Sequence, residues 1–222
     1  MKEIIMGDIY NILITGVGGQ GVIMLGNILR EYGLKVPFIK NVVGTETRGV
    51  SQREGSVIAS TRYLIESKIY SLEENYETED LISPLIPLND AHLVLGLEPL
   101  ETIRHIKYIS EKTVVVLNTH QKYPRNVIIG SKKEKKYPSI GYIIDLLDQL
   151  ARRTISLNFN ELSKIKLDDS IYANIILLGV GMREFREIFN KKVIYNLLID
   201  KFGNNSKNLN AFEIGYNLIN DL

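Results

Sequence analysis

The sequence contains no cysteine and no tryptophan. Within this chain, the absence of cysteine excludes disulfides, thiolate zinc sites, a cysteine nucleophile and iron–sulfur clusters held by cysteine. Aromatic residues make up only 8% of the chain, and its tyrosines are dispersed along the sequence. A surface on which nucleic-acid bases stack needs aromatic side chains gathered beside basic ones, and nothing here predicts one.

Neither sign of charge predominates, since 27 lysines and arginines stand against 26 acidic residues and give a net charge of +1. This balance gives no electrostatic footprint for nucleic acid or for an anionic membrane, and we expect neither as a partner. The longest nearly uncharged stretch, residues 170–182, is too short to span a bilayer. Residues 1–8 lack the apolar core of a signal peptide, so we expect a cytoplasmic protein.

The chain does contain alternating strand-like and helix-like segments. The patterns predict strands over residues 9–15, 36–43, 56–63, 91–97, 113–118, 126–130 and 154–159. They predict helices over residues 20–32, 99–106, 143–150, 170–181, 184–199 and 209–220, with an irregular stretch over 70–87. This alternation predicts one α/β domain over residues 1–222, a three-layer Rossmann-like open sheet, largely parallel, with helices on both faces.

A glycine-rich turn, Gly16-Val17-Gly18-Gly19-Gln20-Gly21, joins the first predicted strand to the first predicted helix. Glycines allow a tight turn and a close approach of another molecule, and the free N–H groups of the new helix can hold an anion. The alternative is that these glycines only let the helix pack closely on the strand.

The turn lacks the additional residues that the dinucleotide-binding and P-loop motifs require. No Asp or Glu lies in residues 34–45, where a dinucleotide-binding fold places its ribose-binding acid. Val22 and Ile23 stand where a P-loop has Lys and Ser or Thr. A nucleotide-binding sensor module and an NAD(P)-dependent oxidoreductase remain alternative functions at this stage.

A second constellation, predicted as a polar loop over residues 44–54, follows the second strand. It is dense in arginines, acids and hydroxyls, and its candidate residues are Thr45, Glu46, Arg48, Ser51, Gln52, Arg53 and Gly55. Ligands of open α/β sheets bind beyond the carboxyl ends of the strands, so we expect this loop to share one surface with the glycine turn. Arg48 or Arg53 should then approach the Gly18–Gly21 backbone, unless the loop pairs its charges internally.

Together, the two constellations resemble the gamma-type subunits of 2-oxoacid:ferredoxin oxidoreductases. The string Ser51-Gln52-Arg53-Glu54-Gly55-Ser56-Val57 is most similar to the variant found in the beta subunit of indolepyruvate:ferredoxin oxidoreductase, with Glu54 in place of a glycine. Residues 90–99, which end in Glu-Pro, an Asn-containing segment at 172–179 and residues 210–216 also resemble this family.

The resemblance implies a subunit that is inactive alone and belongs to a complex that oxidatively decarboxylates a 2-oxoacid to an acyl-CoA. Thiamine diphosphate, magnesium and iron–sulfur clusters are expected on a catalytic partner subunit, because this chain has no cysteine and no Gly-Asp-Gly string. Coenzyme A is a possible co-substrate, and ferredoxin is reached through the complex. The implied cofactor-binding or interface residues are Gly16, Gly18, Gly19, Gln20, Gly21, Thr45, Glu46, Arg48, Ser51, Gln52, Arg53 and Gly55, with no catalytic residue and no metal ligand assigned.

A subunit of this kind must present an apolar surface to its partner. Residues 70–87 mix apolar side chains, including Leu81 and Ile86, with acids and have no predicted regular structure. We expect this stretch to form part of the partner surface and the isolated chain to form a homodimer through it.

Overall fold

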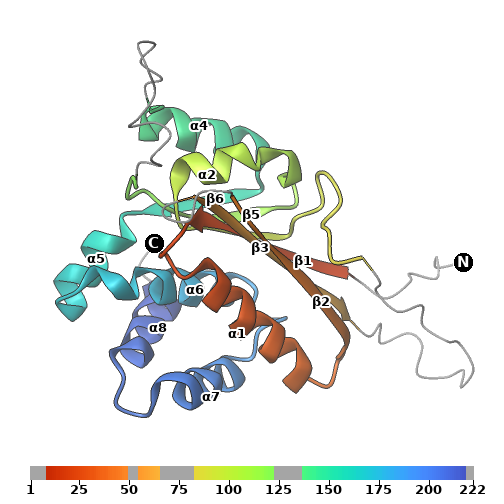
Figure 1. The fold of residues 1–222 in the computed structure, drawn as a ribbon, viewed down its shortest axis with the longest axis vertical. Helices are drawn as coiled ribbons and strands as arrows, with labels where there is room; N and C mark the ends of the chain where they lie inside the picture. Colours follow the sequence, from red (N-terminus) through yellow and green to blue (C-terminus); the bar gives the residue numbers. More distant parts are fainter. Residues whose placement is uncertain (1–8, 50–54, 66–82, 123–136, 219–222) are drawn as a thin grey trace, which may run out of the picture.

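The computed structural model describes residues 9–49, 55–65, 83–122 and 137–218. Its centre is one sheet of six strands in the order β2-β3-β1-β4-β5-β6 (Figure 1). The strands are β1 (Ile9–Val17), β2 (Ile39–Arg48), β3 (Ser56–Ile65), β4 (Leu93–Gly96), β5 (Val114–Asn118) and β6 (Arg153–Leu157).

The sheet is largely parallel, as expected. β1, β4, β5 and β6 pair in parallel, whereas β3 is antiparallel to both of its neighbours, β1 and β2. Only β3 therefore runs against the other described strands. β4 and β5 are buried along their whole length, which explains why their sequences are continuous apolar runs rather than alternating patterns.

Helices cover both faces of the sheet and complete three layers (Figure 1). One face carries α1 (Val22–Lys35), α6 (Ala173–Glu184), α7 (Lys191–Phe202) and α8 (Lys207–Leu218) over the larger apolar core. The other face carries α2 (Pro99–Arg104), the short 3-10 helix η1 (Ile106–Tyr108) and α4 (Ile140–Leu150) over a smaller core. Two further helices, α5 (Phe159–Leu167) and the 3-10 helix η2 (Ser170–Tyr172), connect β6 to α6.

The predicted polar loop over residues 44–54 was wrong in its first half. β2 continues to Arg48, and its residues from Gly44 onward pair with β3 from Thr61 to Val57. β2 is an edge strand, so polar side chains there can reach solvent while the backbone still forms the ladder. β3 lies between β1 and β2, so the first two strands of the chain are not neighbours in the sheet.

Several helix boundaries differ from the prediction. α7 begins at Lys191 rather than at residue 184, because Asn190 caps it by accepting the N–H groups of Lys192 and Val193. The last strand ends at Leu157, and α5, which was not predicted, begins at Phe159 behind the cap residue Asn158. The predicted strand over residues 126–130 lies outside the described residues.

The stretch expected to present apolar side chains to a partner is described only from residue 83 onward. Within this part, Ile86 is 7% exposed and belongs to the smaller core, so its assignment to the surface was wrong. Its neighbours Leu85 and Leu88 are each 64% exposed. Leu81 lies outside the described residues.

Candidate functional site

The glycine turn forms at the carboxyl end of β1, and glycine is required at its different positions for different structural reasons. A Cβ on Gly16 would lie 2.9 Å from both the Gln20 side chain and that of Val22, so Gly16 serves close packing. Gly19 and Gly21 have φ angles of +90° and +87°, which L side chains rarely adopt. The turn thus needs glycine at both positions to bring the chain round into α1.

Gln20 fastens the turn to the neighbouring strand. Its Oε1 accepts the Val17 backbone N–H at 2.8 Å, and its Nε2 donates to the Leu97 carbonyl at 3.0 Å. Because both ends of the amide are engaged inside the protein, Gln20 positions the turn rather than reaching outward to a ligand.

The N-terminus of α1 is open to an anion. Gly21 is its cap residue and provides no side-chain hydrogen bond, and no acidic residue stands in the first turn. The first N–H groups of a helix lack partners within the helix and carry a partial positive charge. The geometry therefore supports the anion interpretation and, at Gly16, also the packing interpretation.

The end of β2 and the start of β3 lie against this turn, as expected. The Gly18 N–H donates to the Gly55 carbonyl at 2.9 Å, and the Gly49 N–H donates to the Ser56 carbonyl at 2.7 Å. A cavity of about 670 Å³ opens between these segments and is lined by Gly18, Gly19, Gly21, Arg48, Gly55 and Lys122, among others. The two segments meet because β3 begins at the edge of the sheet where β1 and β2 end.

Arg48 is the one arginine of this constellation that the structure describes, and it lines this cavity. Its side chain is 67% exposed, and its ion-pair partner in the structure, Glu46, lies 3.9 Å away. An exposed guanidinium whose partner among the described residues is this distant can turn to an incoming anion. Ser51, Gln52 and Arg53 lie outside the described residues.

The two remaining candidates have roles within the fold. Glu46 accepts from Arg30 of α1 at 2.5 Å and so ties the edge strand to the helix. The Thr45 N–H donates to the Ser60 hydroxyl across the β2–β3 pair at 3.3 Å. Glu46 thus pairs with Arg30, which lies outside the predicted loop, and at 3.9 Å with Arg48 within it.

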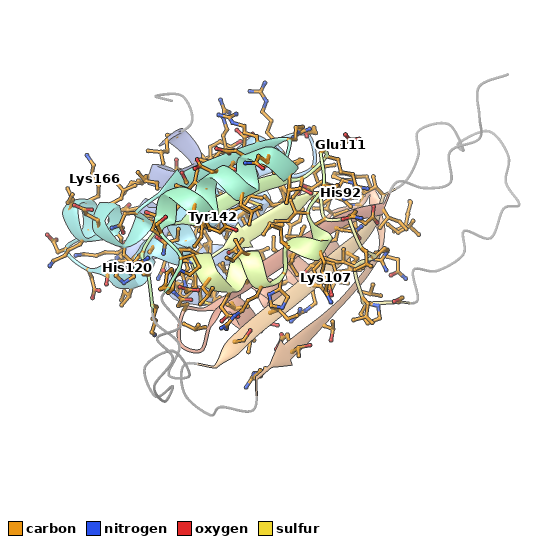
Figure 2. The ribbon with its side chains drawn as sticks, turned by 90° about the horizontal axis from the view of Figure 1, so that it is seen from above. His92, Lys107, Glu111, His120, Tyr142 and Lys166 are labelled. Atoms are coloured by element: carbon orange, nitrogen blue, oxygen red, sulfur yellow. The ribbon has the colours of Figure 1, made fainter. Side chains whose placement is uncertain are left out.

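A second cavity, of about 370 Å³, lies on the other side of the turn, and the sequence interpretation missed it. It is lined by Gly19, Gln20, Leu97, Asn118, His120, Lys122, Asn160, Ser170, Ile171, Ala173 and Asn174. Figure 2 shows His120 at the end of the sheet opposite to His92, so these histidines form no pair. The sequence signal for this cavity was position along the chain, because residues 119–122 directly follow β5, a buried parallel strand.

Amide side chains shape this second cavity. Asn118 donates to Asn160 at 2.7 Å and accepts the Phe159 N–H at 3.0 Å, which fixes the start of α5. Asn174 of α6 donates to the Gln20 carbonyl at 3.0 Å, while its Oδ1 is buried and has no partner among the described residues. The amides thus hold α5 and α6 against the glycine turn.

A buried carboxylate caps the start of α2. Glu98 is 0% exposed, and its side chain accepts from the Tyr137 hydroxyl at 2.5 Å and from the Glu101 N–H at 2.8 Å. Burial raises the pKa of the Glu98 carboxyl above its ordinary value, while the hydrogen bonds from the Tyr137 hydroxyl and the Glu101 N–H oppose that rise.

The described residues contain no group of three or more histidine, aspartate or glutamate side chains that could hold a metal ion. Among the same residues, no helix is long and apolar enough to cross a membrane.

The fold defines a Rossmann-like three-layer α/β domain with an open helix N-terminus at the strand ends. Comparison with known proteins then identifies the family: the model of the family described as pyruvate ferredoxin/flavodoxin oxidoreductase matches residues 11–218 of this chain. The chain belongs to this family.

Its curated relatives include indolepyruvate oxidoreductase subunit IorB of Archaeoglobus fulgidus, 29% identical over 93% of this chain and 94% of that protein. The corresponding subunit of Methanothermobacter thermautotrophicus is 32% identical over 78% of this chain and 77% of that one.

Solved structures share the fold at low sequence identity. The gamma subunit of a keto/oxoacid ferredoxin oxidoreductase from Geobacter sulfurreducens superimposes with a TM-score of 0.60 at 17% identity, covering 96% of this chain and 99% of that one. A 2-oxoglutarate:ferredoxin oxidoreductase from Magnetococcus marinus gives 0.62 at 16% identity, over 96% of this chain and 31% of the larger one.

These comparisons confirm the expected family, the fold class and the assignment to a subunit of 2-oxoacid:ferredoxin oxidoreductases. They give no support to a nucleotide-binding sensor or to an NAD(P)-dependent enzyme.

Proposed function

We propose that this chain is the small subunit of an oxidoreductase complex that oxidatively decarboxylates indolepyruvate, or a similar aryl 2-oxoacid, to the acyl-CoA with ferredoxin as electron acceptor. The observation that carries the proposal is the similarity to an indolepyruvate oxidoreductase subunit over nearly the whole of both chains. We further propose that residues 1–222 form one domain and that the complex works in the cytoplasm.

The chemistry that breaks the carbon–carbon bond and moves electrons belongs to thiamine diphosphate, magnesium and iron–sulfur clusters. We assign these groups to a catalytic partner subunit, because this chain has no cysteine and no Gly-Asp-Gly string. The role left to this chain is to complete the cleft and to receive coenzyme A, an anionic co-substrate.

The edge formed by the glycine turn, Arg48 and Lys122 supports this role. Its helix N-terminus, guanidinium and ammonium surround one cavity, and phosphate groups are the ligands that such a set recognises best. The residues proposed to contact coenzyme A or the partner subunit are therefore Gly18, Gly19, Gly21, Arg48 and Gly55, with Ser51, Gln52 and Arg53 retained from the sequence.

The experiment is reconstitution. We expect the purified chain to reduce no viologen dye with indolepyruvate and coenzyme A, and to support turnover once combined with the thiamine-binding subunit. Turnover by the isolated chain would contradict the proposal. A reconstituted complex that prefers pyruvate over indolepyruvate would retain the reaction class and reject the proposed substrate.

A further inference from the structure

The second cavity, which lies beside Asn118, has the charge of an anion site. Its volume is about 370 Å³, and its described lining includes Lys122 and His120 but no aspartate or glutamate. Among the residues that the structure describes, no carboxylate forms an ion pair with the Lys122 ammonium. The cavity therefore has one fixed positive charge that the described part of the chain does not neutralise.

A fixed amide donor stands on the wall of the same cavity. The Asn118 Oδ1 accepts the backbone N–H groups of Phe159 at 3.0 Å and of His120 at 3.3 Å. The Asn118 Nδ2 is therefore the donor to Asn160, at 2.7 Å, and this bond uses the Asn160 Oδ1. The Asn160 Nδ2 is left as a donor without a partner among the described residues. Because Asn118 is only 3% exposed, the Asn160 amide is held in this orientation from inside the fold.

The chemistry of the lining selects a kind of anion. The ammonium, the Asn160 amide and the Ser170 hydroxyl can all donate, and an ionised carboxylate offers acceptor oxygens only. One fixed positive charge matches a monoanion, whereas the first cavity adds a second cation, Arg48. Leu97 and Ile171 give the second cavity an apolar side, and Ile171 is 65% exposed.

We propose that the second cavity binds a small monocarboxylate with an apolar substituent. The Lys122 ammonium and the Asn160 amide receive the carboxylate, and Leu97 and Ile171 contact the substituent. The inference does not rest on the proposed function, because the ligand needs neither a 2-oxo group nor a phosphate. It adds a binding site beside the first cavity, with Lys122 and Gly19 on the border of both.

The test is an NMR titration of the backbone amides of the full chain with phenylacetate. Its analogue 2-phenylacetamide has nearly the same shape and no charge, and acetate has the charge and no ring. We expect phenylacetate to shift the amides around Asn160 and Ser170. It should bind about tenfold more tightly than either analogue, because each analogue loses one of the two kinds of contact.

Asn160→Asp is the variant that tests the wall of the cavity. It keeps the oxygen that accepts from Asn118 but replaces the Nδ2 donor by a negatively charged oxygen. We expect it to weaken phenylacetate binding at least about tenfold, through the lost donor and through repulsion. Where this variant fails to fold, Lys122→Met replaces it and should weaken binding about tenfold by removing the ammonium.

Asn158→Asp is the matched control, because it adds the same charge outside the described lining of the cavity. Its carboxylate can still cap α5 by accepting the Glu161 N–H, as Asn158 does at 3.1 Å. Arg48→Met is the control for the first cavity, since Arg48 lines that cavity and not the second. Both controls should bind phenylacetate as the wild type does.

Equal affinity of the wild type for phenylacetate and 2-phenylacetamide would overturn the inference, as would a wild type whose amides do not respond to phenylacetate. Unchanged affinity in Asn160→Asp would do the same. A loss in Asn158→Asp as large as that in Asn160→Asp would show that charge at a distance accounts for the effect, and would reject the site. Shifts confined to the amides around Gly21 and Gly55 would place the carboxylate in the first cavity instead.

Discussion

Gly21 combines two constraints that a substitution can separate. Its φ is +87°, and a Cβ there would lie 2.2 Å from the Asn174 amide nitrogen, which donates to the Gln20 carbonyl. We expect Gly21→Ala to lower the free energy of unfolding by about 2–3 kcal/mol, the sum of left-handed strain and a lost hydrogen bond, measured by urea denaturation.

Gly19→Ala is the control for this change. Gly19 has a similar φ of +90°, but the nearest atom to its Cβ is the Lys122 ammonium at 3.8 Å. Only the strain remains, so the loss should be about 1 kcal/mol. Equal losses in the two variants would show that the contact with Asn174 contributes nothing.

The buried Glu98 carboxyl leads to a prediction about pH. Its pKa is raised by burial, so the folded chain holds this proton at a pH where the unfolded chain has lost it. Stability conferred by this group therefore falls as the pH rises from about 4.5 towards the folded pKa. NMR titration of the carboxyl carbon should give a midpoint above 4.5, and Tyr137→Phe should raise it further by removing a donor to the carboxylate. A lower midpoint in Tyr137→Phe would contradict this assignment.

At the scale of elements, the α6–α8 crossing depends on glycine. A Cβ on Gly215 of α8 would lie 1.9 Å from the Ile176 carbonyl oxygen of α6, a backbone atom that cannot turn aside. We expect Gly215→Ala to destabilise the fold by about 3 kcal/mol, at the upper end of the cost of overpacking a core. The thermal unfolding temperature measures the effect.

Gly141→Ala provides the matched control within another helix. No atom lies within 4 Å of a Cβ placed on Gly141 of α4. Alanine favours the helix over glycine by roughly 0.5–1 kcal/mol, so this variant should be equally or more stable than the wild type. If Gly215→Ala were as harmless as Gly141→Ala, the two helices would not be in close contact.

The elements that the sequence predicted best are those fixed by local patterns. The sequence predicted β1, β4 and β5 because strands buried on both faces are continuous apolar runs. It predicted the start of α2 because proline, with its fixed φ, favours the first turn of a helix. β2 was cut short because its polar end is held by pairing with β3, and pairing between strands has no local signature.

The candidate site shows the same difference between residues with a local sequence pattern, which were recognised, and residues without one, which were missed. The glycines of the turn were recognisable because backbone strain demands them, and Arg48 because it stands beside them. Lys122 was missed, since it reaches the turn only because β5, which precedes it, lies two strands from β1 in the sheet. Such a contact becomes visible only once the sheet order is known.

For the whole molecule, two exposed leucines, Leu85 and Leu88, mark a candidate surface for another subunit. The short segment that carries Leu85 and Leu88 is hydrogen-bonded to β3: the Ser60 hydroxyl donates to the Pro84 carbonyl at 2.8 Å, and Arg62 donates to the Ser83 carbonyl at 2.6 Å. Both leucines are 64% exposed although their backbone is anchored. We propose that this surface contacts the catalytic partner, or a second copy of the chain in a homodimer.

The double variant Leu85→Asp/Leu88→Asp tests this surface. Burying one leucine side chain contributes about 1.5–3 kcal/mol, so losing both contacts should weaken association at least tenfold, with the unfolding temperature unchanged. Analytical ultracentrifugation of the chain alone and with the catalytic subunit measures the association. Leu34→Asp is the control, because Leu34 is 78% exposed on α1, over the other face of the sheet, and its loss should leave association intact.

Ile86→Asp, by contrast, should unfold the chain because Ile86 is buried in the smaller core. Association that survives the double variant would place the interface elsewhere, with the edge formed by the glycine turn, Arg48 and Lys122 as the next surface to test.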